Sequence, residues 1–238
     1  MPTLRLISRQ DIAADTTAFT FEKPVDFRFT PGQFVELRLL NPPETDAEGD
    51  ARAFSIASAP FEPALMVATR MRNTAFKRVL KRLPLPAEVE VDGPYGTFTL
   101  PEDGARPVVF IVGGIGITPA RSIVLQAAKS RLPHRIYLFY SNRQPADAAF
   151  LPELDAAERD NPNYLLIATM TETAKSLRTW AGETGRVGWP MLAKHLPDPT
   201  GPVYYVCGPP GMVSAILAVL HGADVSSAQV RVEEFEGY

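Results

Sequence analysis

The feature that most constrains this chain is an apolar run that breaks into a glycine turn and then a helix. Residues 108–112 (VVFIV) are all apolar, which is typical of a strand buried on both faces of a parallel sheet. Residues 113–116 (GGIG) follow, and Thr118 and Pro119 suit an N-cap and a first helical position. A glycine turn before a helix N-terminus binds phosphate readily, because unpaired amides and the helix dipole attract an anion. A tight corner without a ligand would have the same pattern, so the surrounding sequence must decide.

The composition is that of an ordinary globular protein and excludes several classes of function. The 238 residues carry a formal net charge of −3, so we expect no nucleic-acid partner. The single cysteine, Cys207, excludes a disulfide framework and an iron–sulfur cluster held by four thiolates. The histidines show no ligand spacing, so we expect no metal site. Signal-peptide and membrane-spanning patterns are absent, and we expect a cytoplasmic protein.

The first part of the chain, residues 1–104, predicts a small antiparallel β-barrel or sandwich. Short β-type runs are separated by Gly and Pro, as is typical of such folds. One short helix is predicted near residues 74–82, and the acidic loop 41–50 is expected to have no chemical role. The expected strands are residues 4–7, 18–21, 33–39, 52–58, 64–69, 88–91 and 97–100.

Residues 52–58 (RAFSIAS) have unusual chemistry for a scaffold strand. A guanidinium, an aromatic ring and a hydroxyl lie close together in Arg52, Phe54 and Ser55. Such a set suits a flat anionic ligand, because the charge meets phosphate, the ring meets a planar π system and the hydroxyl meets a ring nitrogen. An ordinary edge strand is the alternative reading.

The segment of residues 69–82 is rich in cations and contains no acidic residue. The predicted helix places apolar residues on one face and cations on the other. A solvated helix face is one interpretation. The other is a positive patch that attracts an acidic protein partner. The cations are Arg70, Arg72, Lys77, Arg78, Lys81 and Arg82.

The second part, residues 105–238, predicts a doubly wound parallel α/β sheet, because β-type runs alternate with helical ones. The expected strands are residues 108–112, 135–140, 164–169, 203–207 and 229–235, and the expected helices lie near residues 120–127, 146–159, 190–195 and 213–220. Ligands of such sheets bind at the carboxyl ends of the strands. This rule gathers residues 113–118, 141–143, 169–171 and 207–212 along one rim.

Five motifs in this order resemble the ferredoxin–NADP reductase superfamily. They are RAFSIAS (52–58), GPYG (93–96), GGIGITP (113–119), CGPPGM (207–212) and EEF (233–235). The resemblance covers nearly the whole chain and implies a flavin-binding barrel followed by a nicotinamide-dinucleotide domain, without an iron–sulfur domain. It implies FAD rather than FMN as the flavin, and NADPH or NADH as the electron donor.

The resemblance also implies roles for individual residues. Ser55 would hydrogen-bond flavin N5, Cys207 would lie near nicotinamide C4, and Glu233 would close the far side of the flavin site. Phe54 stands where the family usually has tyrosine, and Arg72 with Asn73 replaces a glycine-rich lead-in. The implied flavin contacts are Arg52, Phe54, Ser55, Arg72, Thr74, Phe235 and Tyr238. The implied nicotinamide-cofactor contacts are Gly114, Gly116, Thr118, Pro119, Ser141, Arg143, Gly208, Pro209 and Met212.

The implied activity is hydride transfer from NAD(P)H to flavin N5, followed by electron transfer to a separate acceptor. Ferredoxin or flavodoxin is the expected acceptor, docked on the positive patch. The reductase component of an oxygenase or hydroxylase is the alternative, and a non-catalytic flavin- or nucleotide-binding subunit is a third reading. Ser141 and Arg143 follow a predicted strand and favour NADPH, because arginine accommodates a 2′-phosphate.

Overall fold

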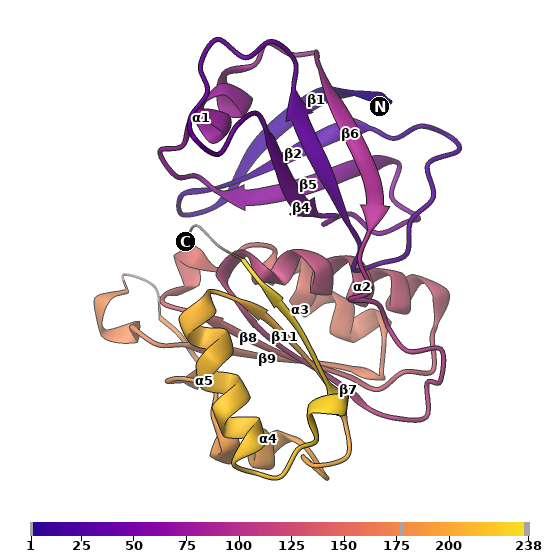
Figure 1. Cartoon of the computed structure of the whole chain (residues 1–238). Helices are drawn as coiled ribbons and strands as arrows, with labels where there is room; N and C mark the ends of the chain where they lie inside the picture. Colours follow the sequence, from indigo (N-terminus) through magenta and orange to yellow (C-terminus); the bar gives the residue numbers. More distant parts are fainter. Residues whose placement is uncertain (1, 177–178, 236–238) are drawn as a thin grey trace.

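The computed structural model describes residues 2–176 and 179–235, which form an N-terminal β-domain above a C-terminal α/β domain (Figure 1). Within these residues the first sheet is antiparallel and has six strands in the order β4-β3-β6-β1-β2-β5. Its strands are β1 (Thr3–Ala13), β2 (Thr16–Glu22), β3 (Phe34–Leu39), β4 (Ala51–Ser55), β5 (Ala64–Arg70) and β6 (Ala87–Tyr95).

The two outer strands of this order meet, which closes the sheet into a barrel. Ile56 bridges Val67 just beyond β4, and the Ala57 N–H donates to the Met66 carbonyl at 2.8 Å. The helix α1 (Ala75–Arg82) packs apolar side chains, including Phe76, into the barrel core. Both the barrel and the short helix were predicted from the sequence, and both are confirmed.

The second sheet is parallel and has six strands among the described residues, in the order β10-β9-β8-β7-β11-β12. Its strands are β7 (Val108–Gly113), β8 (Ile136–Asn142), β9 (Tyr164–Met170), β10 (Glu183–Thr184), β11 (Val203–Gly208) and β12 (Val230–Glu234). The helices are α2 (Ile117–Ser130), α3 (Leu151–Asp160), α4 (Trp189–His195) and α5 (Pro210–His221). From β7 the chain adds strands on one side of the sheet up to β10, and β11 then pairs with the other side of β7. The carboxyl ends of β7 and β11 are therefore the topological switch point.

Burial on both faces explains the unbroken apolar run of β7. Phe110 and Val112 join a core with α2 and α3, whereas Val109 and Ile111 join a second core with α4 and α5. Figure 1 shows α2 running between the parallel sheet and the barrel. None of the helices in the described ranges is both long enough and apolar enough to cross a membrane.

Several local expectations differ from the structure. Residues 97–100 form no strand, because Phe98 packs edge-on against Tyr205 in the α/β domain with ring centroids 5.0 Å apart. The helix predicted from residue 146 begins only at Leu151, because Pro145–Asp147 form a 3-10 turn and Phe150 adopts a φ of 60°. The short strand β10 has no counterpart in the sequence prediction.

Candidate functional site

Two glycine turns meet at the switch point between β7 and β11. A Cβ on Gly208 would lie 3.2 Å from the backbone N and O of Gly113, and a Cβ on Gly116 would lie 2.5 Å from the Cys207 carbonyl oxygen. At Gly116 the backbones approach too closely for any larger residue, and at Gly208 the tight contact is combined with a φ of 153° that larger residues rarely adopt. Glycine is required here for packing, whether or not a ligand is bound.

The helix after the first turn starts earlier than predicted. Gly114–Gly116 form a 3-10 turn that runs directly into α2, so the N-cap is Gly116 and not Thr118. The Thr118 hydroxyl is 1% exposed and donates to the Ile115 carbonyl at 3.0 Å, and Pro119 is buried as well. A ligand at this turn would therefore meet backbone amides rather than these two side chains.

Cys207 and Glu233 lie opposite each other in the register of β11 and β12. Burial, together with the nearby Glu233 carboxyl, raises the pKa of the Cys207 thiol well above its usual range. Burial also raises the pKa of Glu233 to about 7. The Oε2 atom of Glu233 is buried and has no hydrogen-bond partner among the described residues. An unsatisfied polar atom and a perturbed carboxyl at a strand end are typical of a ligand site.

The glycine turn contacts the barrel. Ile115 shares a buried cluster with Ala18 of β2 and Ala68 of β5, and Met66 and Phe235 pack against it. Met66 is also the residue whose carbonyl accepts from Ala57, two residues beyond Ser55. Ser55 is the last residue of β4 and is 6% exposed. The fold thus brings the two predicted halves of the site to the same domain seam.

The remaining rim residues occupy the predicted edge of the sheet. Ser141 is in register with Gly113 of the neighbouring strand, and Arg143 lies just beyond it, exposed. Met212 covers Gly113, because a Cβ there would lie 2.3 Å from its sulfur. Pro209 is the N-cap of α5. Tyr238 lies outside the described residues.

In the barrel, the hydrogen-bond donors expected to bind an anion are already paired with carboxylates. Arg52 pairs with Asp46 at 3.3 Å and with Glu48 at 2.7 Å. The other Asp46 oxygen accepts the backbone N–H of Ala75, the first residue of α1, at 2.8 Å, and this bond lowers the pKa of Asp46. These donors therefore suit an anion such as pyrophosphate. In this structure, however, they bind carboxylates of the acidic loop 41–50, which was expected to have no chemical role.

Two other residues predicted to contact the flavin, Thr74 and Phe54, lie close to this ion pair. Thr74 caps α1 by accepting from the Lys77 N–H at 3.4 Å. The Phe54 ring is 8% exposed and packs on Phe76 in the barrel core, with centroids 5.8 Å apart. Little of this ring is therefore open to a planar ligand.

In the structure, some cations of the predicted positive patch are paired or partly buried, so fewer of them are exposed than the sequence predicted. Arg78 pairs with Glu44, and the Lys77 ammonium donates to the Arg70 carbonyl at 2.8 Å. Burial, with the neighbouring charges of Arg72 and Arg52, lowers the pKa of Lys77 to about 8. The exposed members of the patch line one hollow of about 350 Å³ and are Arg72, Lys81 and Arg82. The Lys81 ammonium also makes a long, exposed ion pair with Asp11 at 3.9 Å.

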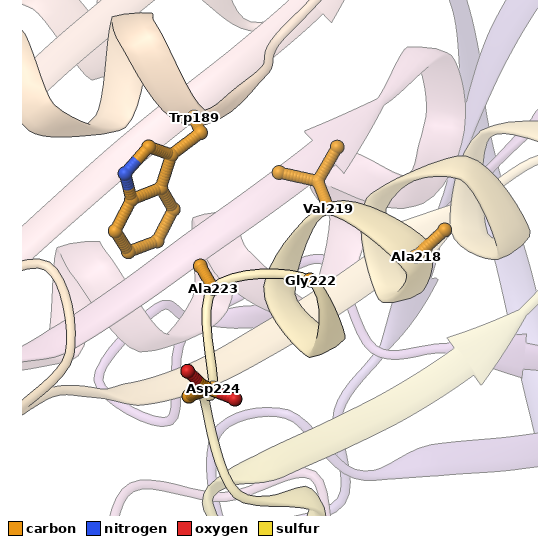
Figure 2. Close-up of a pocket in the computed structure, with 6 residues that line it drawn as sticks. All are labelled: Trp189, Ala218, Val219, Gly222, Ala223 and Asp224. Atoms are coloured by element: carbon orange, nitrogen blue, oxygen red, sulfur yellow. The ribbon is translucent and has the colours of Figure 1, made fainter.

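A larger hollow of about 480 Å³ lies away from these residues (Figure 2). It is formed by Trp189 at the start of α4, by the last turn of α5 and by the residues that follow this helix, including Asp224. Since α5 starts at the carboxyl end of β11, this hollow lies at the opposite end of that helix. Among the described residues that line it, Asp224 alone is ionisable, so these residues form no catalytic set.

Sequence reasoning missed two residues that structure places at the site. Asp46 lay in a loop to which no role was given, and Arg121 was given no role either. An arginine among the apolar helical positions Ala120, Ile123 and Val124 was the available signal. Its side chain is 3% exposed, at the seam between the domains.

Known proteins resemble both the sequence and the fold. Residues 110–217 match the family of oxidoreductase NAD-binding domains. The glycine betaine monooxygenase reductase subunit of Chromohalobacter salexigens is 30% identical over 89% of this chain and 58% of that protein. Ferredoxin–NADP reductase B of Sorangium cellulosum is 29% identical over 98% of this chain and 96% of that protein.

The fold comparison points the same way. The ferredoxin–NADP⁺ reductase of Neisseria gonorrhoeae, solved with bound FAD and NADP, matches with a TM-score of 0.78 and 20% identity over 98% of both chains. The chain spans 57–62% of the length of curated monooxygenase reductase components that it matches. With its barrel, its parallel sheet and the NAD-binding match over residues 110–217, the chain resembles the ferredoxin–NADP reductase-like FAD- and NAD(P)-binding oxidoreductases in sequence and shares their two-domain fold.

Proposed function

We propose that the chain oxidises NAD(P)H with a bound FAD and passes the electrons to a separate protein acceptor. One observation carries the proposal: the buried Oε2 of Glu233, which has no hydrogen-bond partner in the part of the chain that the structure describes, lies at the sheet edge where the turn Gly114–Gly116 contacts the barrel. When bound, the flavin would accept a hydride at N5 and release electrons one at a time, which nicotinamide cannot do.

The chain's own residues would bind, orient and exclude water. Backbone amides at the N-terminus of α2 would bind the nicotinamide cofactor's pyrophosphate. Ser55 would donate a hydrogen bond to the flavin ring, and the buried Cys207 would pack beside the nicotinamide. Glu233, with a pKa of about 7, would hold a proton at this site in about half of the molecules at neutral pH. Holding both cofactors in one geometry would supply much of the acceleration.

The preferred donor of electrons would be NADPH. Arg143 follows the second strand of the α/β unit and is exposed. A guanidinium at this position accommodates the 2′-phosphate that distinguishes NADPH from NADH. The ratio of kcat/KM for the two nucleotides tests this preference, and a ratio that favours NADH would contradict it.

The acceptor would be ferredoxin or flavodoxin, bound by the exposed cations Arg72, Lys81 and Arg82. A second candidate is an oxygenase component, because several relatives are named as monooxygenase reductase subunits. Both candidates share the same first step and differ only in the protein that is reduced. Side-by-side reduction rates with a ferredoxin, a flavodoxin and an oxygenase component would separate them.

The proposal is tested by purifying the protein and following its flavin. We expect a yellow protein that releases FAD on denaturation and that NADPH bleaches under anaerobic conditions. Released flavin is identified by chromatography against FAD and FMN standards. A colourless protein that also rejects added FAD and FMN would contradict the proposal, whatever its acceptor.

A further inference from the structure

Arg121 is a charged residue buried at the seam between the two domains. It lies in the second turn of α2, and its side chain is 3% exposed. Burying a charge is costly unless it is paired and fully hydrogen-bonded. Arg121 meets this condition, because each of its guanidinium nitrogens donates at 3.0 Å or less.

The partners of Arg121 come from both domains. It donates in a forked geometry to Glu153 on α3, at 2.7 Å for each bond, and this pair lies within the α/β domain. It donates likewise to Glu62 of the barrel, at 2.9 and 3.0 Å, and to the Ala57 carbonyl at 2.6 Å. These ion pairs raise the pKa of Arg121 even though burial alone would lower it.

The next residue of α2 adds a further hydrogen bond across the seam. The Ser122 hydroxyl donates to the Ser58 carbonyl at 2.7 Å and is fully buried. Consecutive residues of α2 therefore bind consecutive carbonyls of the barrel segment that follows Ser55. An arginine fork fixes the direction as well as the distance of its partners, which a lysine does not.

Both ends of this contact lie close to the proposed reaction site. Arg121 is five residues after Gly116, about 7.5 Å along the helix at 1.5 Å per residue. Ala57 is two residues from Ser55, at most about 7 Å along an extended chain. Because packed interiors transmit strain, a shift at Arg121 would be felt at both half-sites.

We propose that Arg121 is a positioning residue that sets the separation between the flavin half-site at Ser55 and the nicotinamide half-site at Gly114–Gly116. It acts through Glu62 and the Ala57 carbonyl and touches neither cofactor. This inference rests on the proposed function, and it adds a residue to which the sequence analysis gave no role.

The test compares Arg121→Lys and Glu62→Gln with the wild-type holoenzyme. Arg121→Lys keeps the charge but loses the fork, and Glu62→Gln keeps the shape but weakens the pair across the seam. We expect flavin content to be unchanged and flavin reduction at saturating NADPH to slow about tenfold or more, since a displacement of 1 Å can cost about 100-fold. The long-wavelength charge-transfer absorbance between nicotinamide and flavin should fall in parallel.

Two further variants separate positioning from general destabilisation. Glu153→Gln weakens an equally close pair inside one domain and should slow reduction less than Glu62→Gln does. Asp155→Asn, also on α3, breaks a pair with Arg159 whose two side chains are 65% and 72% exposed, and it should match the wild type. Hydrogen exchange of residues 56–62 should rise in Arg121→Lys and Glu62→Gln but not in Asp155→Asn.

Failure of the positioning role and failure of the proposed function would give different results. If wild-type protein is bleached normally and both seam variants keep its reduction rate and charge-transfer absorbance, the positioning role is wrong while the proposed function stands. The role is also wrong if Glu153→Gln slows reduction as much as Glu62→Gln. A wild-type protein that neither nucleotide bleaches would overturn the proposed function and this inference together.

Discussion

Among single residues, Glu233 carries the clearest link between structure and pH. Burial raises its pKa from 4.5 to about 7. Between these values the unfolded chain has lost this proton and the folded chain has kept it, so stability falls as pH rises. The favourable contribution of the protonated carboxyl is complete below about pH 4.5 and is lost as pH rises through about 7.

Replacing Glu233 by glutamine should remove this pH dependence. We expect Glu233→Gln to be more stable than the wild type at pH 8, by about 1–3 kcal/mol, because an uncompensated buried charge is no longer formed. Urea unfolding at pH 5 and pH 8 measures the difference. The exposed neighbour Glu234 provides the control, since Glu234→Gln should keep the wild-type profile. Parallel profiles for wild type and Glu233→Gln would show that Glu233 does not titrate in this range.

Asp46 makes a second prediction at the scale of the residue. Its carboxylate accepts hydrogen bonds from both Arg52 and the first amide of α1, and these two donors would suit the pyrophosphate of FAD. An internal anion that must be displaced lowers the apparent affinity for the external one. Asp46→Asn should therefore tighten FAD binding by about threefold or more, measured by quenching of flavin fluorescence.

The specificity of this effect can be checked in two ways. Riboflavin carries no phosphate, so its affinity should not change in Asp46→Asn. Asp50 lies in the same loop but pairs with Arg38 at 2.6 Å, and Asp50→Asn should leave FAD binding unchanged. Weaker FAD binding in Asp46→Asn would mean instead that Asp46 orients Arg52 for the cofactor.

At the scale of the element, patterns within one segment predicted well. The all-apolar run of β7 indicated a doubly buried strand, and alternation in residues 4–7 and 33–39 indicated barrel strands. Boundaries failed where a neighbour from elsewhere in the chain decides the conformation. Phe98 is drawn out of a predicted strand by Tyr205, more than 100 residues away. The start of α2 was misplaced because a 3-10 turn replaces the predicted cap.

The glycine turn gives a prediction for this element. A Cβ at position 116 would lie 2.5 Å from the Cys207 carbonyl oxygen, so the backbone must move. Gly116→Ala should lose about 1–3 kcal/mol of unfolding free energy and should weaken NADPH binding. Gly211→Ala is the matched control, because nothing lies within 4 Å of its Cβ position. A Gly116→Ala protein with the stability and NADPH affinity of the control would contradict the close approach.

At the scale of the whole molecule, the sequence predicted two domains and the motifs that face each other, but not what joins them. Arg121 contacts Glu62 and Ala57 across roughly 60 residues of sequence. No local periodicity records such a contact. The charge pattern was likewise incomplete, because Glu44 lies 34 residues before the Arg78 that it neutralises. The structure therefore adds to the sequence prediction the ion pairs that join segments distant in sequence.

The exposed cations Arg72, Lys81 and Arg82 supply the prediction at this scale. They face one hollow on a protein of net charge −3, so an acidic partner would be steered to this face. The double variant Lys81→Glu with Arg82→Glu should lower kcat/KM for the reduction of ferredoxin or flavodoxin about tenfold at low salt. The difference should shrink as salt screens the charges, since the Debye length is about 8 Å at 0.15 M ionic strength. Reduction of a small uncharged acceptor should not change, and Arg159→Glu, on the α/β domain, controls for a charge reversal outside the patch. Equal losses in Arg159→Glu and in the double variant would place the partner elsewhere.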